Sequence, residues 1–137
     1  MNFSKTTEYS IRILILMATE KDKIFSAQFL NKKLGIPYKY LTNLLKRLSD
    51  LGFISSSRGR RGGYKLLKEL KDVSIYQIIG AIEGFEIFTK CILGFMKCNE
   101  SNPCPMHNEW SKVREHSISV LKKMTLFELK NLENCRI

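Results

Sequence analysis

A helical repeat of leucines in residues 38–51 constrains the fold of this chain more than any other feature. The repeat follows the i, i+3, i+4, i+7 spacing of one core-facing helix side, and its members are Leu41, Leu44, Leu45 and Leu48. The opposite face is polar and basic, and comprises Lys39, Thr42, Asn43 and Lys46. A helix with these two faces is expected to pack its leucines into a core and to present its basic side to a partner.

A second, shorter helix is expected just before this repeat. Ser26 is a suitable N-cap for it, the helix runs to Leu34, and Gly35 tolerates the positive φ of a tight turn. Two helices joined in this way, the second basic on its outer face, predict a helix-turn-helix. In this motif the second helix enters the major groove, where Asn43 can pair with adenine, Thr42 can meet a thymine methyl, and the lysines can reach guanine or phosphate. The alternative is a polar face that contacts only solvent.

The periodicity changes after the leucine repeat. Residues 53–57 and 64–66 are typical of two short strands, and the glycine-rich segment 58–63 between them is typical of a hairpin tip. The tip carries three cations whose guanidinium groups suit the negative potential of a minor groove: Arg58, Arg60 and Arg61. A plain hairpin loop with incidental charge is the alternative. The predicted fold class is mainly α with a small β-hairpin wing, a winged helix-turn-helix.

The charge of the chain favours a polyanionic partner. The formal net charge is +10, and the first 84 residues carry fifteen basic side chains against seven acidic ones. Residues 32–65 contain nine basic residues and a single acid. Such concentration on one motif predicts binding to a double-stranded DNA operator, with a basic RNA-binding module as the rival class. An enzyme is not expected, because His107 and His116 have no acid–base or nucleophile constellation around them.

A long helix is expected near the end of the chain, over residues 106–124. One side of it comprises Trp110, Val113, Ser117, Val120, Leu121 and Met124. Because a helix this long has little local core to cover, it is predicted to pack against a second subunit of a homodimer; burial within its own domain is the alternative. Residues 6–19 form another helix, apolar around most of its circumference, and therefore expected at the centre of the fold or in the dimer interface.

The chain is accordingly divided into a DNA-binding domain (residues 1–84), a cysteine-rich loop (85–107), and a dimerisation helix with a C-terminal tail (108–137). No export signal or membrane span is expected, since the apolar stretch 11–18 is short and interrupted by Arg12. The chain is therefore predicted to be cytoplasmic. In that reducing compartment, cysteines are expected to bind metal or to be redox-active rather than to form disulfides.

Three thiols gather in one aperiodic segment. Cys91, Cys98 and Cys104 lie within fourteen positions, separated by six and then five residues. Thiolates are soft ligands that suit zinc or iron–sulfur clusters, and structural zinc usually shows paired C-x₂-C units that are absent here. Wide spacing favours an iron–sulfur cluster, while zinc or a cysteine thiol switch remains the alternative. His107 is either a fourth ligand or a helix-start residue, and Cys135 is taken as a bystander.

Several segments resemble the Rrf-type family of winged-helix transcription regulators, whose members include an iron–sulfur cluster regulator and a nitric-oxide sensor. The similar segments are residues 1–12, 35–41, the wing at 57–64, the cysteine triplet, and 125–129. The likeness covers nearly the whole chain, and the wing together with the cysteine triplet makes it specific. One departure is the six-residue gap after Cys91, where familiar members have five.

The resemblance implies a homodimer in which each subunit binds a cluster through Cys91, Cys98 and Cys104. It implies His107 as the fourth ligand, with Glu8 as the alternative, and a [2Fe–2S] cluster is favoured over a [4Fe–4S] cluster. The implied function is a repressor whose operator affinity responds to redox state, nitric oxide or iron–sulfur status. Three thiolates and one weaker ligand leave a corner open to attack, so loss of the cluster is expected to release the loop and change DNA affinity.

Overall fold

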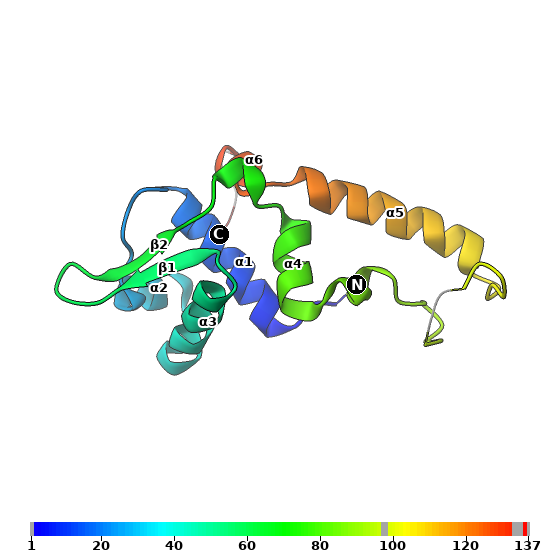
Figure 1. Cartoon of the computed structure of the whole chain (residues 1–137), viewed down its shortest axis with the longest axis horizontal. Helices are drawn as coiled ribbons and strands as arrows, with labels where there is room; N and C mark the ends of the chain where they lie inside the picture. Colours follow the sequence, from blue (N-terminus) through cyan, green and yellow to red (C-terminus); the bar gives the residue numbers. More distant parts are fainter. Residues whose placement is uncertain (1, 97–98, 133–135, 137) are drawn as a thin grey trace.

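The computed structural model describes residues 2–96, 99–132 and 136, and it is mainly helical with one antiparallel hairpin (Figure 1). The helices are α1 (Lys5–Ala18), α2 (Ala27–Leu34), α3 (Tyr38–Asp50), α4 (Ile75–Glu83), α5 (His107–Lys123) and α6 (Leu126–Lys130). The hairpin strands are β1 (Ile54–Ser57) and β2 (Gly63–Leu66), and two 3₁₀ segments are η1 (Leu70–Asp72) and η2 (Phe85–Phe88). The predicted fold class is confirmed.

The helix-turn-helix is built by local capping and by the leucine stripe. The Ser26 hydroxyl caps α2 by accepting from the Phe29 N–H at 3.1 Å. Gly35 ends α2 at φ 65°, and the Asn31 side-chain amide donates to the Ile36 carbonyl at 2.6 Å across the turn. All four leucines of the α3 stripe are buried. The left-handed conformation of Gly35 and the hydrogen bond from Asn31 to Ile36 together define the turn between α2 and α3.

Helix α1 runs through the centre of the fold and contacts α2, α3, α4, α6 and β2 (Figure 1). Ile13, Leu14 and Met17 on this helix are fully buried. The apolar surface of this helix predicted a position either at the centre of the fold or in a dimer interface, and the helix lies at the centre. Elements far apart in the sequence share one core because each of them packs against this helix.

A third extended segment supports the hairpin. In the β1–β2 pair, Ile54 lies opposite Leu66 and Ser57 opposite Gly63. Phe25, which precedes α2, adds an antiparallel bridge to Tyr64, with both backbone N–H···O distances at 2.8 Å. No local pattern in the sequence indicates this bridge. A Cβ at Gly63 would lie 2.5 Å from the Phe25 carbonyl oxygen, so only glycine permits the close approach.

The end of the chain returns to the winged helix after α5. Helix α5 extends away from the rest of the fold, and the cysteine loop lies at its far end (Figure 1). Leu126, the first residue of α6, is fully buried, and its N–H donates to the Val73 carbonyl at 2.8 Å. The Ile75 N–H donates in turn to the Met124 carbonyl at 2.9 Å. Within the described ranges, no helix combines the length and the apolarity needed to cross a bilayer.

The C-terminal end of α4 is fastened to two other helices. Arg47 of α3 donates from Nη2 to the Ile82 carbonyl at 2.7 Å. The Glu83 carboxylate accepts from the Ser4 N–H at 2.8 Å and from the Thr7 hydroxyl at 2.6 Å. The hydrogen bonds from Ser4 and Thr7 lower the pKa of Glu83 below its ordinary value.

This arrangement predicts a pH-dependent contribution to stability. Because the folded-state pKa of Glu83 is depressed, its stabilisation is present above the unfolded pKa and is lost as pH falls through the folded pKa. Glu83→Gln should lower the free energy of unfolding at pH 7 by about 1 kcal/mol, a small value for charge-assisted bonds because the group is half-exposed. Urea titrations at pH 7 and at successively lower pH measure the difference, which should shrink as pH falls below the unfolded-state pKa of the carboxyl. A difference independent of pH would contradict this account.

Candidate nucleic-acid interface and cysteine site

Most of the predicted contact residues of α3 face solvent. Lys39, Asn43 and Lys46 are exposed, whereas Thr42 is half-buried. The Thr42 hydroxyl donates to the Lys39 carbonyl at 2.9 Å, so it is already engaged within the helix. The helix therefore presents one amide and two ammonium groups, with the leucine stripe behind them.

The wing tip presents the three predicted arginines. Arg58, Arg60 and Arg61 are all exposed. The tip closes through a hydrogen bond of 3.0 Å from the Gly62 N–H to the Gly59 carbonyl, and a Cβ at Gly62 would clash with the Ser57 backbone. The glycines thus allow a tight loop in which the chain can place several guanidinium groups at the end of one hairpin.

Two polar residues of α3 have structural partners that the sequence did not reveal. Arg47 is held by the Ile82 carbonyl, so it links α3 to α4. The Tyr40 hydroxyl lies 2.8 Å from the Thr6 hydroxyl, and its ring meets Tyr9 edge to face at 5.8 Å. Both side chains orient α3, the second helix of the helix-turn-helix and hence the recognition helix, on the core. In the sequence neither is distinguishable from a further DNA contact.

We expect Asn43→Ala and Arg60→Ala to affect DNA binding differently. Loss of a bidentate base contact should cost about 1–3 kcal/mol and relax preference at one base pair. Loss of a wing arginine should weaken binding to all duplexes and reduce the slope of log affinity against log salt by about 1. Fluorescence anisotropy with a selected duplex and a scrambled one measures both effects. Unchanged affinity in both variants would contradict this placement of the DNA face.

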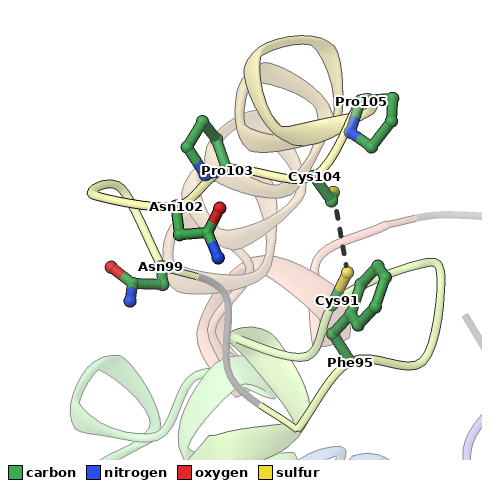
Figure 2. Close-up of a pocket in the computed structure, with 7 residues that line it drawn as sticks. All are labelled: Cys91, Phe95, Asn99, Asn102, Pro103, Cys104 and Pro105. Carbon is green, nitrogen blue, oxygen red and sulfur yellow. Dashed lines mark hydrogen bonds between the residues drawn. The ribbon is translucent and has the colours of Figure 1, made fainter.

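The described part of the cysteine loop brings two of its thiols together. The sulfur atoms of Cys91 and Cys104 point toward one another and lie 3.8 Å apart (Figure 2). Cys91 is buried and Cys104 is half-buried. They open into a pocket of about 380 Å³, whose other lining residues are Phe95, Asn99, Asn102, Pro103 and Pro105.

The Cys91 thiol experiences opposing influences. Burial acts to raise its pKa, but hydrogen bonds from the backbone N–H groups of Leu93, Phe95 and Gly94, together with the hydrogen bond between the Cys91 and Cys104 thiols, lower it below its ordinary value. Backbone donors of this kind stabilise a thiolate, which is the form that binds metals and attacks disulfides.

The spacing of the two thiols fits metal ligation. Two thiolates about 2.3 Å from one tetrahedral metal centre lie about 3.8 Å from each other, and this is the separation observed between Cys91 and Cys104. The same distance suits a zinc ion or one iron of a cluster. The described residues hold no group of three His, Cys, Asp or Glu side chains arranged to bind a metal. Cys98, the predicted third thiol, lies outside the described residues, as does Cys135.

The two predicted fourth ligands lie on different helices. His107 begins α5, and its backbone N–H donates to the Cys104 carbonyl at 3.0 Å. His107 is therefore close to Cys104 along the chain. Glu8 lies in the first turn of α1, and its carboxylate pairs with Lys5 at 2.7 Å.

An aromatic cluster connects the cysteine loop to α4 and α5. Phe88, three residues before Cys91, is buried and stacks on Tyr76 of α4 at 4.4 Å. The Phe85 ring lies so close to Gly80 that a Cβ there would clash with it. On the other side, the Lys122 ammonium sits 4.8 Å from the centre of the Tyr76 ring.

The start of α5 is tied to the same loop, because the Trp110 indole N–H donates to the Lys90 carbonyl at 3.2 Å. The N-terminal end of the loop, at Phe88 and Lys90, therefore contacts both α4 and α5.

A helix-turn-helix whose leucine stripe is buried and whose outer face is exposed, followed by a basic hairpin, defines a winged-helix DNA-binding protein. Residues 3–131 match the Rrf2 family, described as iron-dependent transcriptional regulators. The chain belongs to this family, and its function is that of a transcriptional regulator rather than an enzyme.

Two curated relatives agree with this assignment. A protein of Aquifex aeolicus, provisionally named an HTH-type transcriptional regulator, is 30% identical over 135 residues, covering 97% of this chain and 94% of the relative. The HTH-type transcriptional regulator IscR of Yersinia pseudotuberculosis is 33% identical over 102 residues, covering 74% of this chain and 62% of IscR.

Solved structures share the fold. CymR, the global cysteine regulator of B. subtilis, superimposes with a TM-score of 0.81 at 24% identity, covering 95% of this chain and 96% of CymR. Staphylococcus aureus CymR superimposes with a TM-score of 0.76 at 26% identity, covering 96% of this chain and 100% of CymR. The S. aureus protein has also been solved in an oxidized form. IscR of T. potens superimposes with a TM-score of 0.72 at 23% identity, covering 94% of this chain and 85% of IscR.

Proposed function

We propose that this chain is a repressor whose affinity for its DNA operator is controlled by an iron–sulfur cluster held in the cysteine loop. The observation that carries the proposal is the 3.8 Å separation of the Cys91 and Cys104 sulfurs beside an open pocket. Cys98 would complete the thiolate set. In the sequence, five residues separate Cys98 from Cys104, and Cys98 directly precedes Asn99, which lines the pocket. The similarity to IscR supports the same assignment.

The roles of the chain's residues follow from this assignment. Cys91, Cys98 and Cys104 would hold a cluster, with [2Fe–2S] preferred to [4Fe–4S], and His107 is proposed ahead of Glu8 as the fourth ligand. When bound, the cluster supplies reactivity toward oxidants and nitric oxide. The backbone N–H groups around Cys91 would stabilise the thiolate charge. The face formed by Lys39, Thr42, Asn43 and Lys46, with the wing arginines, would bind the operator.

A thiol switch is the second candidate function. The same two sulfurs lie close enough that a modest loop movement would allow a Cys91–Cys104 disulfide, and CymR offers a structural relative with an oxidized form. Zinc would satisfy the same spacing. Each alternative keeps the winged helix and changes only what the loop contains.

One experiment separates these possibilities. Protein purified without air should absorb visible light and contain iron and acid-labile sulfide, in a ratio per chain that distinguishes [2Fe–2S] from [4Fe–4S]. Colourless protein with one zinc per chain would favour the zinc alternative. Colourless, metal-free protein that loses the mass of two hydrogen atoms when a mild oxidant accepts two electrons from it, with Cys91 linked to Cys104 in peptide mapping, would favour the thiol switch.

The identity of the fourth ligand can be tested by paired variants. His107→Ala should retain the cluster but shift its absorption and shorten its lifetime in air, because three thiolates remain. Glu8→Gln, the matched change on α1, should leave both properties unchanged. The reverse result would assign the fourth ligand to Glu8.

The working protein is proposed to be a cytoplasmic homodimer. None of the described residues of α5 is buried, and Val113 and Val120 on it are 52% and 45% exposed. A seventeen-residue helix that covers no core of its own is expected to gain stability by packing against a copy of itself. In the proposed division of the chain, residues 1–84 bind DNA, 85–107 hold the cluster, and 108–137 dimerise, although α6 packs back on the first part.

Control of DNA affinity would act through the contacts around α4. A change in the loop at Cys91 would reach Phe88, and through the stack with Tyr76 it would reach α4. The end of α4 holds the recognition helix through the Arg47 bond to the Ile82 carbonyl. The two states of the loop would therefore favour different positions of α3, and the ratio of their DNA affinities would equal the coupling between the two sites.

A further inference from the structure

A basic notch lies between the tip of the wing and the start of α2. It is a pocket of about 320 Å³, lined among others by Lys23, Phe25, Ser26, Phe29, Arg60 and Arg61. The two arginines were predicted as wing contacts, but Lys23 belongs to the connection between α1 and α2 and was assigned no role. Three cations thus converge on one small hollow from segments that are distant in the sequence.

Lys23 contacts two aromatic rings and a carboxylate. Its ammonium nitrogen lies 5.2 Å from the ring centres of both Phe25 and Phe29, which are 5.8 Å from each other. This contact with two aromatic faces holds the long side chain over the hollow. Glu20 accepts a hydrogen bond from the same ammonium at 3.0 Å, so the carboxylate offsets part of its charge.

The wing is held against this lysine by the backbone. The bridge between Phe25 and Tyr64 joins the residue at the floor of the notch to strand β2, with both N–H···O distances at 2.8 Å. The bridge therefore keeps the hairpin that carries Arg60 and Arg61 beside the segment that carries Lys23. The notch is a preformed group of cations on the side of the fold that carries the wing.

We propose that the notch binds one backbone phosphate of duplex DNA, beside the groove that α3 enters. This inference rests on the proposed DNA-binding function. A phosphodiester has one negative charge and exposed oxygens, which match a rim of ammonium and guanidinium donors open to solvent. The Lys23 ammonium already contacts the faces of Phe25 and Phe29, so these rings are not available to stack on a base. The notch would therefore recognise its ligand by charge. Lys23 would thus add affinity and fix the register of the protein on DNA without reading sequence.

The first test measures the salt dependence of binding for Lys23→Met. The probes are a duplex enriched from a random pool by the wild-type protein and a scrambled duplex of the same length. The slope of log affinity against log salt should fall by about 1 on both duplexes, and the ratio of the two affinities should stay unchanged. An unchanged slope, or a loss confined to the enriched duplex, would overturn the proposal.

A matched pair of carboxylate variants provides the second test. Glu20→Gln releases Lys23 in the notch, whereas Glu69→Gln removes the same charge from the pair with Lys21 (2.5 Å), which lies outside the notch. Glu20→Gln should tighten binding to both duplexes more than Glu69→Gln does, and equal effects would overturn the proposal. If the wild-type protein prefers no duplex, the proposed operator binding fails, while the slopes on scrambled DNA still decide the role of the notch.

Discussion

Cys104→Ala should yield colourless protein when purified without air, whereas the wild-type protein should be coloured. The physical reason is the geometry of the thiol pair. Cys91 and Cys104 have sulfurs 3.8 Å apart, as expected for two ligands of one metal centre, so removing either leaves that centre with one fewer anchoring thiolate. Cys91→Ala and Cys98→Ala should have the same effect. The expected loss is nearly complete, which makes visible absorption and iron content decisive measurements.

Cys135→Ala is the matched control, because it removes one thiol from the same chain at a position predicted to be a bystander. It should retain colour and iron at wild-type levels. Thermal unfolding of every variant separates loss of the cluster from loss of the fold. Retention of colour in Cys91→Ala, Cys98→Ala and Cys104→Ala alike would end the cluster proposal, and loss of colour in Cys135→Ala as well would show that the ligand set is wrong.

The paired substitution Val113→Glu and Val120→Glu should convert the protein into a monomer. Both side chains are about half-exposed, seven residues apart on α5, and therefore on one face of the helix. Two carboxylates on each copy would place four negative charges in a desolvated interface, which is strongly unfavourable. Because no described residue of α5 is buried within its own chain, the monomer should keep its winged helix folded.

Loss of the dimer should weaken operator binding far more than loss of any single DNA contact. In a dimer the second winged helix binds at a high effective concentration, an advantage of about 10²–10⁴ in affinity that the monomer lacks. Sedimentation gives the oligomeric state and anisotropy gives the affinity. Ser119→Glu, a charge added at an exposed position away from both valines, is the control and should remain dimeric. A double variant that stays dimeric would place the interface elsewhere.

Much of the fold could be predicted because its signals are local. The leucine spacing in α3, the cap at Ser26 and the left-handed turn at Gly35 depend on residues within a few positions of one another. The same holds for the hairpin, whose glycines and strand residues are neighbours in the chain. The helix-turn-helix and the wing therefore lie close to the bounds predicted from these local signals.

Contacts between distant segments could not be predicted in this way. Leu126 begins the short helix α6 near the end of the chain, yet it is fully buried in the winged-helix core. Arg47 looked like one more basic residue of the recognition helix, but it caps the carbonyl of Ile82. Neither the burial of Leu126 nor the contact between Arg47 and Ile82 is indicated by a sequence spacing, because each depends on how α4 and α6 pack around α1.

By itself, the sequence determined the elements of this protein and the chemistry available to it: a basic helix, an arginine-tipped hairpin and a set of soft thiol ligands. The spacing of apolar residues, helix capping and residue type are properties of short segments, so they can be identified in the sequence before the fold is known. Only the tertiary structure brought Cys91 within 3.8 Å of Cys104 and Lys23 into one notch with the wing arginines. These distances follow from close packing of remote segments on a shared core, which no local pattern specifies.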